Sequence, residues 1–299
     1  MQNLNYYIKN PWRFLAGFAF HLPFLFSDKL YLKLLARPFT GYNLDIDSPK
    51  SFCEKIQWLK LHDHDKSYSK MTDKILAKEY VSGIIGDKYI IPTYQVWNTI
   101  DEIDISVLPD RFVLKTNNGG GSNGVIVCRD KESFNYDTAR KILKSSLNTN
   151  IYKTHLEWAY KDIEPKIFAE MLIENDNGGD LIDYKIFCFN GEPKYIQVIQ
   201  DRRSVETIDF FDTEWNLQEF VGLNPDVKNS TEPIGQPQNL DEMLAIARKL
   251  SAGIRFLRID LYNINGTIYF GEITFYPASG MGRFKPSIWD RRLGDMIVL

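Results

Sequence analysis

Apolar residues recur at helical spacing in the first third of the chain. Over residues 52–62 they fall every three or four positions, which predicts an amphipathic helix. Thr72 and Asp73 can cap a second helix, and Gly86 would end it because glycine readily adopts the left-handed conformation found after helices. The pattern therefore predicts helical structure before residue 86.

After this point the pattern changes to short segments rich in isoleucine, valine and tyrosine, which is typical of strands. Asn190-Gly191 lies between two alternating segments and is a strong signal for a hairpin turn. Helical spacing returns at 134–158 and 240–253. The predicted strands lie at 88–97, 111–117, 123–130 and 166–173 and in hairpins at 183–202 and 255–275. Helices mixed with antiparallel hairpins favour an α+β fold over a doubly wound parallel sheet.

A strongly apolar segment, Phe14–Phe26, lies near the start of the chain. It is 13 residues long, whereas a membrane-spanning helix needs about 20 apolar residues, and His21 and Pro23 interrupt it. No small-residue cleavage site follows, so a signal peptide is not indicated. Two interpretations stay open: a helix packed on the body of the protein, or a peripheral membrane contact through residues 9–33, whose aromatic and basic residues interleave.

Length and composition describe an ordinary folded protein. The 299 residues allow about two domains or one larger unit, and 44% hydrophobic with 25% charged residues excludes disordered and low-complexity classes. The net charge is −3 without a dense basic run, so we expect no nucleic acid partner. Three separated cysteines and four histidines without zinc spacing argue against a disulfide framework or a zinc site, and favour a cytoplasmic protein.

The first candidate for chemistry is a glycine-rich loop between two predicted strands. Lys115 ends the first strand, and the loop holds Gly119, Gly120, Gly121 and Ser122. Glycine leaves backbone N–H groups able to point at phosphate oxygens, and the lysine adds a positive charge at the same place. The spacing fits neither a Walker motif nor a dinucleotide-binding fingerprint. A flexible hairpin loop with a solvated lysine is the alternative.

Two acidic residues of the last hairpin, Asp260 and Glu272, are candidate ligands for a cation that prefers oxygen, such as Mg²⁺. The length of the turn decides whether the two side chains lie on the same face of the sheet. A two-residue turn at 265–266 would send their side chains to opposite faces of the sheet. A three-residue loop at 264–266, with a left-handed glycine, would put Arg258 opposite Glu272 and both acids on one face.

The three-residue loop is the register that we predict, because it separates charge from aliphatic bulk. It places Arg258, Asp260, Glu272 and Thr274 on one face of the hairpin and leaves large apolar residues on the other. Two carboxylates and an arginine would form a Mg²⁺ site beside an anion site. The alternative is an ion pair on a solvated sheet face.

The middle of the chain offers a third set of polar residues. Asp183 and Lys185 lie two positions apart on one predicted strand and therefore share a face, while Arg202 and Arg203 end the partner strand. A carboxylate for a ribose hydroxyl and cations for phosphates would have this arrangement, but a cross-strand salt bridge would too. Glu170 stands in a short apolar strand, where it could accept a hydrogen bond from the amino group of a purine while neighbouring backbone pairs with the ring edge.

In this order the groups resemble the motifs of ATP-grasp enzymes, from about Thr72 to Phe284. The last hairpin is similar to that of D-alanine–D-alanine ligases, where an arginine stabilises the acyl phosphate and two acids bind Mg²⁺. One departure is Thr274, where ATP-grasp enzymes usually have asparagine. The resemblance implies an ATP-grasp fold, in which two α+β subdomains clasp ATP.

The resemblance also implies roles for individual residues. The implied ATP-binding residues are Lys74, Lys115, Gly119, Gly120, Gly121, Ser122, Glu170, Met171, Leu172, Ile173, Asp183 and Lys185. The implied ligands of Mg²⁺ are Asp260, Glu272 and Thr274. The implied catalytic residues are Arg258, Lys185 and Arg202. The residues implied to bind substrate carboxylates are Arg202, Arg203, Arg283 and Lys285.

The N-terminal half of the chain shows which branch of the ATP-grasp enzymes it resembles. Residues 48–63, 71–81, 84–97 and 108–123 closely resemble the TupA-like branch, which is associated with teichuronopeptide and other surface-polysaccharide synthesis. This implies a cytoplasmic ligase, at the inner face of the membrane if the N-terminal contact forms, that joins an amino acid or related amine to a uronic acid of a cell-surface glycan or its precursor. Rival functions are an ATP-grasp kinase of a sugar or polyol hydroxyl and a non-catalytic nucleotide-binding assembly protein.

The predicted organisation has three parts. Residues 1–71 form a helical N-terminal segment, residues 72–172 the subdomain with the glycine-rich lid, and residues 173–299 the C-terminal subdomain with the metal site.

Overall fold

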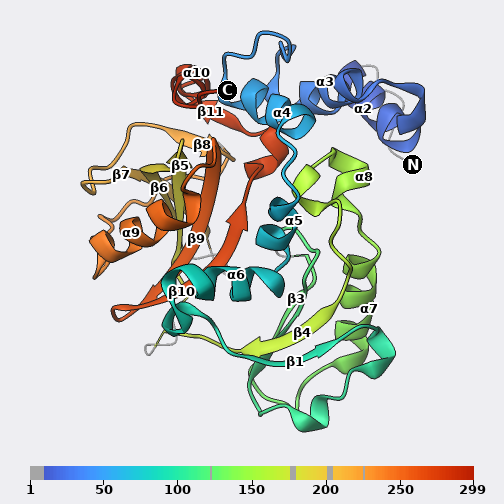
Figure 1. The fold of residues 1–299 in the computed structure, drawn as a ribbon, viewed down its shortest axis with the longest axis vertical. Coiled ribbons are helices and arrows are strands. Elements are labelled where there is room, and N and C mark those ends of the chain that lie inside the picture. Colours follow the sequence, from blue (N-terminus) through green and yellow to red (C-terminus); the bar gives the residue numbers. More distant parts are fainter. Residues whose placement is uncertain (1–9, 122, 176–179, 201–204, 225) are drawn as a thin grey trace.

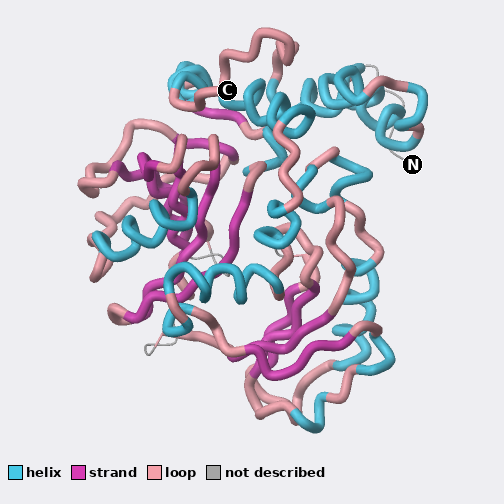
Figure 2. The backbone as a smooth tube through the Cα atoms, viewed as in Figure 1, coloured by secondary structure: helices cyan, strands magenta, loops and turns pink. Residues whose placement is uncertain are grey.

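The computed structural model describes residues 10–121, 123–175, 180–200, 205–224 and 226–299. Helices and antiparallel strands are mixed along the chain (Figure 2), which confirms the predicted α+β class. Three of the predicted site residues, Ser122, Arg202 and Arg203, lie outside the described residues.

The described chain begins with helices whose ends follow from local sequence. Proline begins α2 at Pro11, where its fixed φ suits the first helical position. Pro23 follows the end of this helix, so the predicted apolar helix is interrupted there. Ser27 caps the next helix, and Ser51 with Glu54 forms a capping box on the one after it. These helices are α2 (Pro11–His21), η1 (Pro23–Leu25), α3 (Asp28–Thr40) and α4 (Phe52–His62).

Helix length also bears on the membrane question. Within the described ranges, none of the helices combines the length and the continuous apolar run that crossing a bilayer would take.

The first sheet has four antiparallel strands in the order β1-β4-β2-β3. Helix α7 (Tyr136–Leu147) contacts it, and Leu143 of this helix joins Phe112, Leu114 and Ile167 in a small apolar core. The strands are β1 (Thr93–Trp97), β2 (Phe112–Thr116), β3 (Val125–Cys128) and β4 (Ile167–Met171). The glycine-rich loop joins β2 to β3 at one end of this sheet, as predicted.

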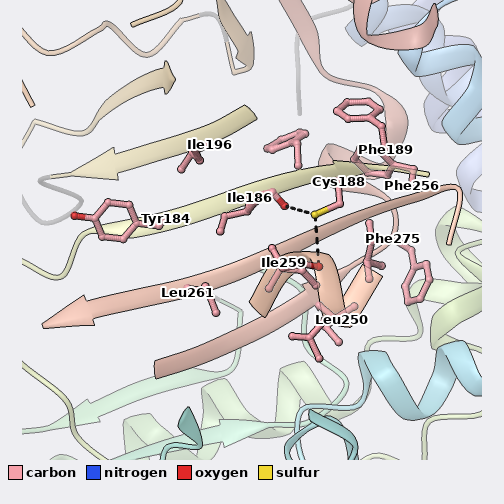
Figure 3. Packing of buried hydrophobic residues seen from close by; sticks show 14 of the residues in the cluster. Tyr184, Ile186, Cys188, Phe189, Ile196, Leu250, Phe256, Ile259, Leu261 and Phe275 are labelled. Atoms are coloured by element: carbon pink, nitrogen blue, oxygen red, sulfur yellow. Dashed lines mark hydrogen bonds between the residues drawn. The ribbon is translucent and has the colours of Figure 1, made fainter. Parts of the chain in front are cut away.

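The second sheet has five antiparallel strands in the order β10-β9-β5-β6-β7. Helices α6 (Leu76–Ile85) and α9 (Leu240–Ser251) pack against it. Figure 3 shows Cys188 and Ile259 of the sheet close to Leu250 of α9, all within the main apolar core. The strands are β5 (Asp183–Phe189), β6 (Glu192–Gln200), β7 (Thr207–Asp212), β9 (Phe256–Ile264) and β10 (Thr267–Thr274). Because side chains alternate along a strand, the neighbours of these core residues point to the opposite face.

The remaining helices and strands are short and lie outside these two sheets (Figure 1). They are α5 (Ser67–Thr72), η2 (Asp87–Tyr89), η3 (Ile100–Glu102), η4 (Ile105–Val107), α8 (Ile151–His155), η5 (Trp158–Tyr160), β8 (Val221–Leu223), η6 (Pro277–Gly280), β11 (Arg283–Lys285) and α10 (Ile288–Asp295).

The register of the last hairpin differs from the prediction. The turn has two residues, Asn265 and Gly266, both with positive φ, and Arg258 lies opposite Thr274 instead of Glu272. This turn is the type that Asn-Gly favours, since its twist matches that of the strands. The acids still share a face, because a β-bulge at Gly271 removes one residue from the pairing and puts Glu272 opposite Asp260.

Glycine is favoured at this bulge for a steric reason. A Cβ atom at position 271 would lie 3.0 Å from the carbonyl oxygen of Asp260. We expect Gly271→Ala to lower the free energy of unfolding by about 1–2 kcal/mol, measured by urea denaturation. The matched control is Gly83→Ala in α6, where a Cβ meets no atom within 4 Å and stability should rise by about 0.5–1 kcal/mol. Equal effects at the two positions would contradict the role of the bulge.

Candidate functional site

A cavity of about 760 Å³ lies between the two sheets, and charged residues from both contribute to its wall. Most residues that the sequence singled out line it. They are Lys74, Lys115, Gly119, Gly120, Gly121, Glu170, Asp183, Lys185, Arg258, Asp260, Glu272 and Thr274. Residues up to 200 positions apart along the chain, from Lys74 to Thr274, therefore meet in one place.

Other predicted residues are not among those that line the cavity. Met171 ends β4, and Leu172 and Ile173 follow it. Arg283 and Lys285 lie on the exposed side of β11, where the guanidinium of Arg283 is 3.5 Å from Asp226. This strand pairs with β8, and it is the partner residue Leu223 that reaches the cavity.

The strongest feature of the cavity is a cluster of cations and acids on one face of the second sheet. Arg258 donates to both carboxylate oxygens of Asp260, from Nε at 2.6 Å and from Nη2 at 2.7 Å. The same Nη2 lies 3.1 Å from Glu272 and 3.0 Å from the hydroxyl of Thr274. Lys185, on the neighbouring strand β5, forms an ion pair with Asp260.

Neighbouring charges shift the pKa values of Glu272 and Arg258. Burial alone would raise the pKa of Glu272, but Lys74, Lys185 and Arg258 outweigh it and lower that pKa to about 2. Burial would likewise lower the pKa of Arg258, whereas the attraction and hydrogen bonds of Asp260 raise it. Glu272 is therefore a carboxylate at neutral pH, and both acids have cations around them.

Lys74 connects this cluster to the glycine-rich loop. Its Nζ lies 3.8 Å from Glu272 and also donates to the carbonyl of Gly119. Burial lowers the pKa of Lys74, and Glu272 opposes the shift. A Cβ at Gly119 would lie 2.6 Å from the carbonyl oxygen of Asn123, so the loop can take this path only with glycine at that position.

Two asparagines just before the loop also hold it, and the sequence analysis did not single them out. Asn117 donates to Asp73 at 2.7 Å, and its amide oxygen accepts from the backbone of Lys166 at 2.6 Å. Asn118 donates to the carbonyl of Thr149 at 3.0 Å, just after α7. The signal was available as two adjacent polar residues at the end of an apolar strand.

Glu170 is placed in the cavity as predicted, but its carboxylate already has two partners. Lys115 forms an ion pair with it, and Lys78 lies 2.6 Å away. Burial would raise the pKa of Glu170, and the two lysines together lower it. Lys78 was missed because it lies on α6, and the sequence does not show which face of that helix meets β4.

One part of the cavity wall is formed by Glu157, Tyr160 and Ser279, and we call it the far end of the cavity. The sequence did not indicate these residues. Lys60 of α4 is 2% exposed, and its Nζ donates to the carbonyl of Ser279 at 2.8 Å and to its hydroxyl at 2.7 Å. Glu157 and Tyr160 line the same end. Burial raises the pKa of Glu157 and lowers that of Lys60 to about 8, each being the other's main opposing charge.

Ser279 belongs to a loop with unusual backbone geometry. Ala278 and Ser279 both have positive φ, at 47° and 54°, which costs free energy for residues that carry a Cβ. Gln57 of α4 donates to the carbonyl of Ser279 at 2.8 Å, beside Lys60. Two side chains of α4 therefore stabilise a strained loop at the wall of the cavity.

The donor set suits Mg²⁺ that arrives with phosphate. Among the described residues, no group of three or more histidine, cysteine, aspartate or glutamate side chains is arranged to hold a metal ion alone. Asp260 and Glu272 lie opposite each other, and the hydroxyl of Thr274 is 3.3 Å from Glu272. Mg²⁺ commonly takes one or two protein carboxylates and completes its shell with water and substrate phosphates.

Comparisons with solved structures find ligases of low sequence identity. D-Alanine–D-alanine ligase from Bacillus anthracis is 20% identical over 71% of this chain and 58% of its own, with a TM-score of 0.39. The same enzyme from Helicobacter pylori is 16% identical over 76% and 61%, with a TM-score of 0.38. N5-carboxyaminoimidazole synthase from Aspergillus clavatus is 14% identical over 69% and 44%, with a TM-score of 0.37. The chain thus spans less than two thirds of each of these proteins.

A comparison with curated protein sequences gave no match. The family model of the TupA-like ATP-grasp proteins, in contrast, matches residues 54–298, which is most of the chain. This match confirms the predicted family and the ATP-grasp fold that goes with it. The chain belongs to the TupA-like ATP-grasp family.

Proposed function

We propose that this ATP-grasp enzyme is an ATP-dependent ligase that forms an amide between a carboxylate and an amine through an acyl phosphate. The observation that supports it most is the cavity, where two cations of the second sheet and Lys74 surround two carboxylates beside a glycine-rich loop. Phosphoryl transfer needs this kind of site, because positioning and charge neutralisation supply most of the catalysis.

The lysines at the two sides of the cavity would hold ATP. Lys74 and Lys115 lie beside the glycine-rich loop, and Lys185 lies opposite them on the second sheet. Each now pairs with an acid that phosphate could replace as its partner. Asp260 and Glu272 would hold Mg²⁺, which supplies charge neutralisation on the ATP phosphates when bound.

The proposed reaction has two steps. An oxygen of the substrate carboxylate attacks the γ-phosphorus of ATP, the bond to ADP breaks, and an acyl phosphate forms. The amine then attacks the acyl carbon, the C–O bond to phosphate breaks, and the amine loses a proton. Arg258 is placed to meet negative charge on the acyl group, because it lies among the same carboxylates that would hold Mg²⁺.

The far end of the cavity is the proposed place for the amine. Glu157 is 8% exposed and lines this end together with Tyr160. A carboxylate whose pKa burial raises is suited to accept the proton that the amine loses. Lys60 fixes the wall beside it through Ser279, so it acts as a positioning residue.

The proposed acceptor is a uronic acid of a capsular or other cell-surface polysaccharide, or of its precursor, and the proposed amine is an amino acid. Support comes from membership of the TupA-like branch, whose resemblance implies surface-polysaccharide synthesis. The rival is a kinase of a sugar hydroxyl, since the same cavity and a base such as Glu157 would also serve that reaction.

Products distinguish the two activities. The protein is incubated with ATP, Mg²⁺ and a panel of uronic acids and amino acids. The carboxylate of the uronic acid carries ¹⁸O. A ligase releases ADP and phosphate only when acid and amine are both present, and the phosphate carries one ¹⁸O atom from the acid. ADP without phosphate, together with a phosphorylated sugar, would establish the kinase and overturn the ligase.

The role of the lysines can be measured separately. Lys115→Ala and Lys185→Ala should each weaken MgATP binding by about 1.5–3 kcal/mol, the scale of a hydrogen bond to a charged group. Calorimetry gives the affinities, and Lys141→Ala, an exposed lysine of α7, is the control. Unchanged affinity in both variants would contradict the proposed ATP site.

The role of Lys60 predicts a different outcome. Lys60→Met leaves two partly buried oxygens of Ser279 without this donor and Glu157 without a counter-charge. We expect the free energy of unfolding to fall by about 1–3 kcal/mol and MgATP affinity to stay the same. Urea denaturation and calorimetry measure the two effects, with Lys66→Met as the exposed control. Loss of MgATP affinity in a folded Lys60→Met protein would place Lys60 in the ATP site instead.

A further inference from the structure

Helices α2 and α3 and the turn between them expose large apolar side chains outside the cavity. We call these residues the N-terminal apolar surface. They are Trp12, Phe14, Leu15, Phe18, Phe20, Phe24, Leu25, Leu30 and Phe39. Phe24 and Leu25, at the turn, are 78% and 56% exposed. Isolated exposed apolar residues are ordinary, but nine within 28 positions form an unusually apolar surface.

The fold does not need these side chains for its core. Within α2 the buried residues are Ala16 and Ala19, two small side chains that let the helix pack closely on α3. The bulky residues of α2 point elsewhere and are partly or largely exposed. Their exposure costs free energy in water, which a bilayer interface would recover.

Charge favours a negatively charged surface as the partner. Residues 11–40 contain four Lys or Arg and one Asp, a net charge of +3, whereas the whole chain carries −3. Arg37 lies over the ring of Trp12, with 5.1 Å between the guanidinium carbon and the ring centroid. Aromatic and apolar side chains interleaved with basic ones are typical of helices that lie in the interface of anionic membranes.

This surface adjoins one end of the cavity. The hydroxyl of Tyr31 on α3 donates to the carbonyl of Thr154 at 2.8 Å, and the ring of Phe20 lies 6.3 Å from that of His155. Thr154 and His155 belong to α8 and line the cavity. Figure 1 shows α8 directly beside α2 and α3.

We propose that the N-terminal apolar surface docks the protein on a bilayer that contains anionic phospholipid, with the α8 end of the cavity toward the membrane. The turn residues enter the interface, and the basic residues of α2 and α3 meet the lipid headgroups. The docking is peripheral, in keeping with the short helices. It does not depend on which reaction the cavity carries out.

The first test is co-sedimentation of the full chain with vesicles of phosphatidylglycerol and phosphatidylcholine. Binding should rise with the anionic fraction and fall with added salt. The double variant Phe24→Ser/Leu25→Ser should bind at least about tenfold more weakly. The matched control, Val107→Ser/Leu217→Ser, removes two equally exposed apolar side chains elsewhere and should bind as the unaltered protein does.

Orientation is tested with a fluorophore on a single new cysteine, since the three native cysteines are buried. Energy transfer to an acceptor in the lipid headgroups should be stronger from Lys153→Cys on α8 than from Lys141→Cys on α7. Equal transfer, or stronger transfer from α7, would overturn the orientation.

Three results would overturn the docking itself: no vesicle binding, equal binding by both double variants, or concentration-dependent dimers that only Phe24→Ser/Leu25→Ser abolishes. The last would assign the surface to a second copy of the chain. MgATP affinity, measured on the same variants, should be unchanged, so failure of the docking is distinguishable from failure of the ATP site.

Discussion

The cavity depends on one electrostatic constraint: two carboxylates and two cations share one face of a sheet, and a third cation, Lys74, approaches Glu272 from the segment between α5 and α6. Arg258 and Lys185 form ion pairs with Asp260, and Arg258 and Lys74 form ion pairs with Glu272. The cations around Glu272 lower its pKa to about 2. Breaking a buried ion pair by removing one of its partners costs about 3–5 kcal/mol. Because Lys74, just before α6, pairs with Glu272 and also donates to Gly119, the cluster connects β5, β9 and β10 to the glycine-rich loop and holds the two sides of the cavity in position. In the proposed ATP site, binding of MgATP would therefore exchange these ion pairs for new ones.

Alternation along the strands was enough to predict that both acids share a face, but not how they come to share it. The Asn265-Gly266 pair specifies a two-residue turn, which by itself would separate them. The bulge at Gly271 corrects the parity. The three-residue turn that we predicted also places both acids on one face, because a longer turn and a bulge each add one residue to the hairpin. The position of a bulge depends on cross-strand contacts, which the spacing of apolar residues does not reveal.

Residues close to a motif were easier to predict than residues that reach it from elsewhere. Lys78, Lys60 and Glu157 come from helices and loops whose rotation relative to the sheets is set by tertiary packing. Their local sequences look like ordinary amphipathic segments. Conversely, Arg283 and Lys285 were attractive as nearby cations, yet pairing of β11 with β8 leaves them exposed and outside the residues that line the cavity.

The most direct test of the charge cluster is Mn²⁺ binding, followed by electron paramagnetic resonance, with and without a non-hydrolysable ATP analogue. If Arg258, Lys185 and Lys74 neutralise Asp260 and Glu272 in the nucleotide-free protein, Mn²⁺ should bind weakly alone. It should bind tightly only with the analogue, and Asp260→Asn should abolish that gain. Equally tight Mn²⁺ binding without nucleotide, or an unaffected Asp260→Asn protein, would contradict the account.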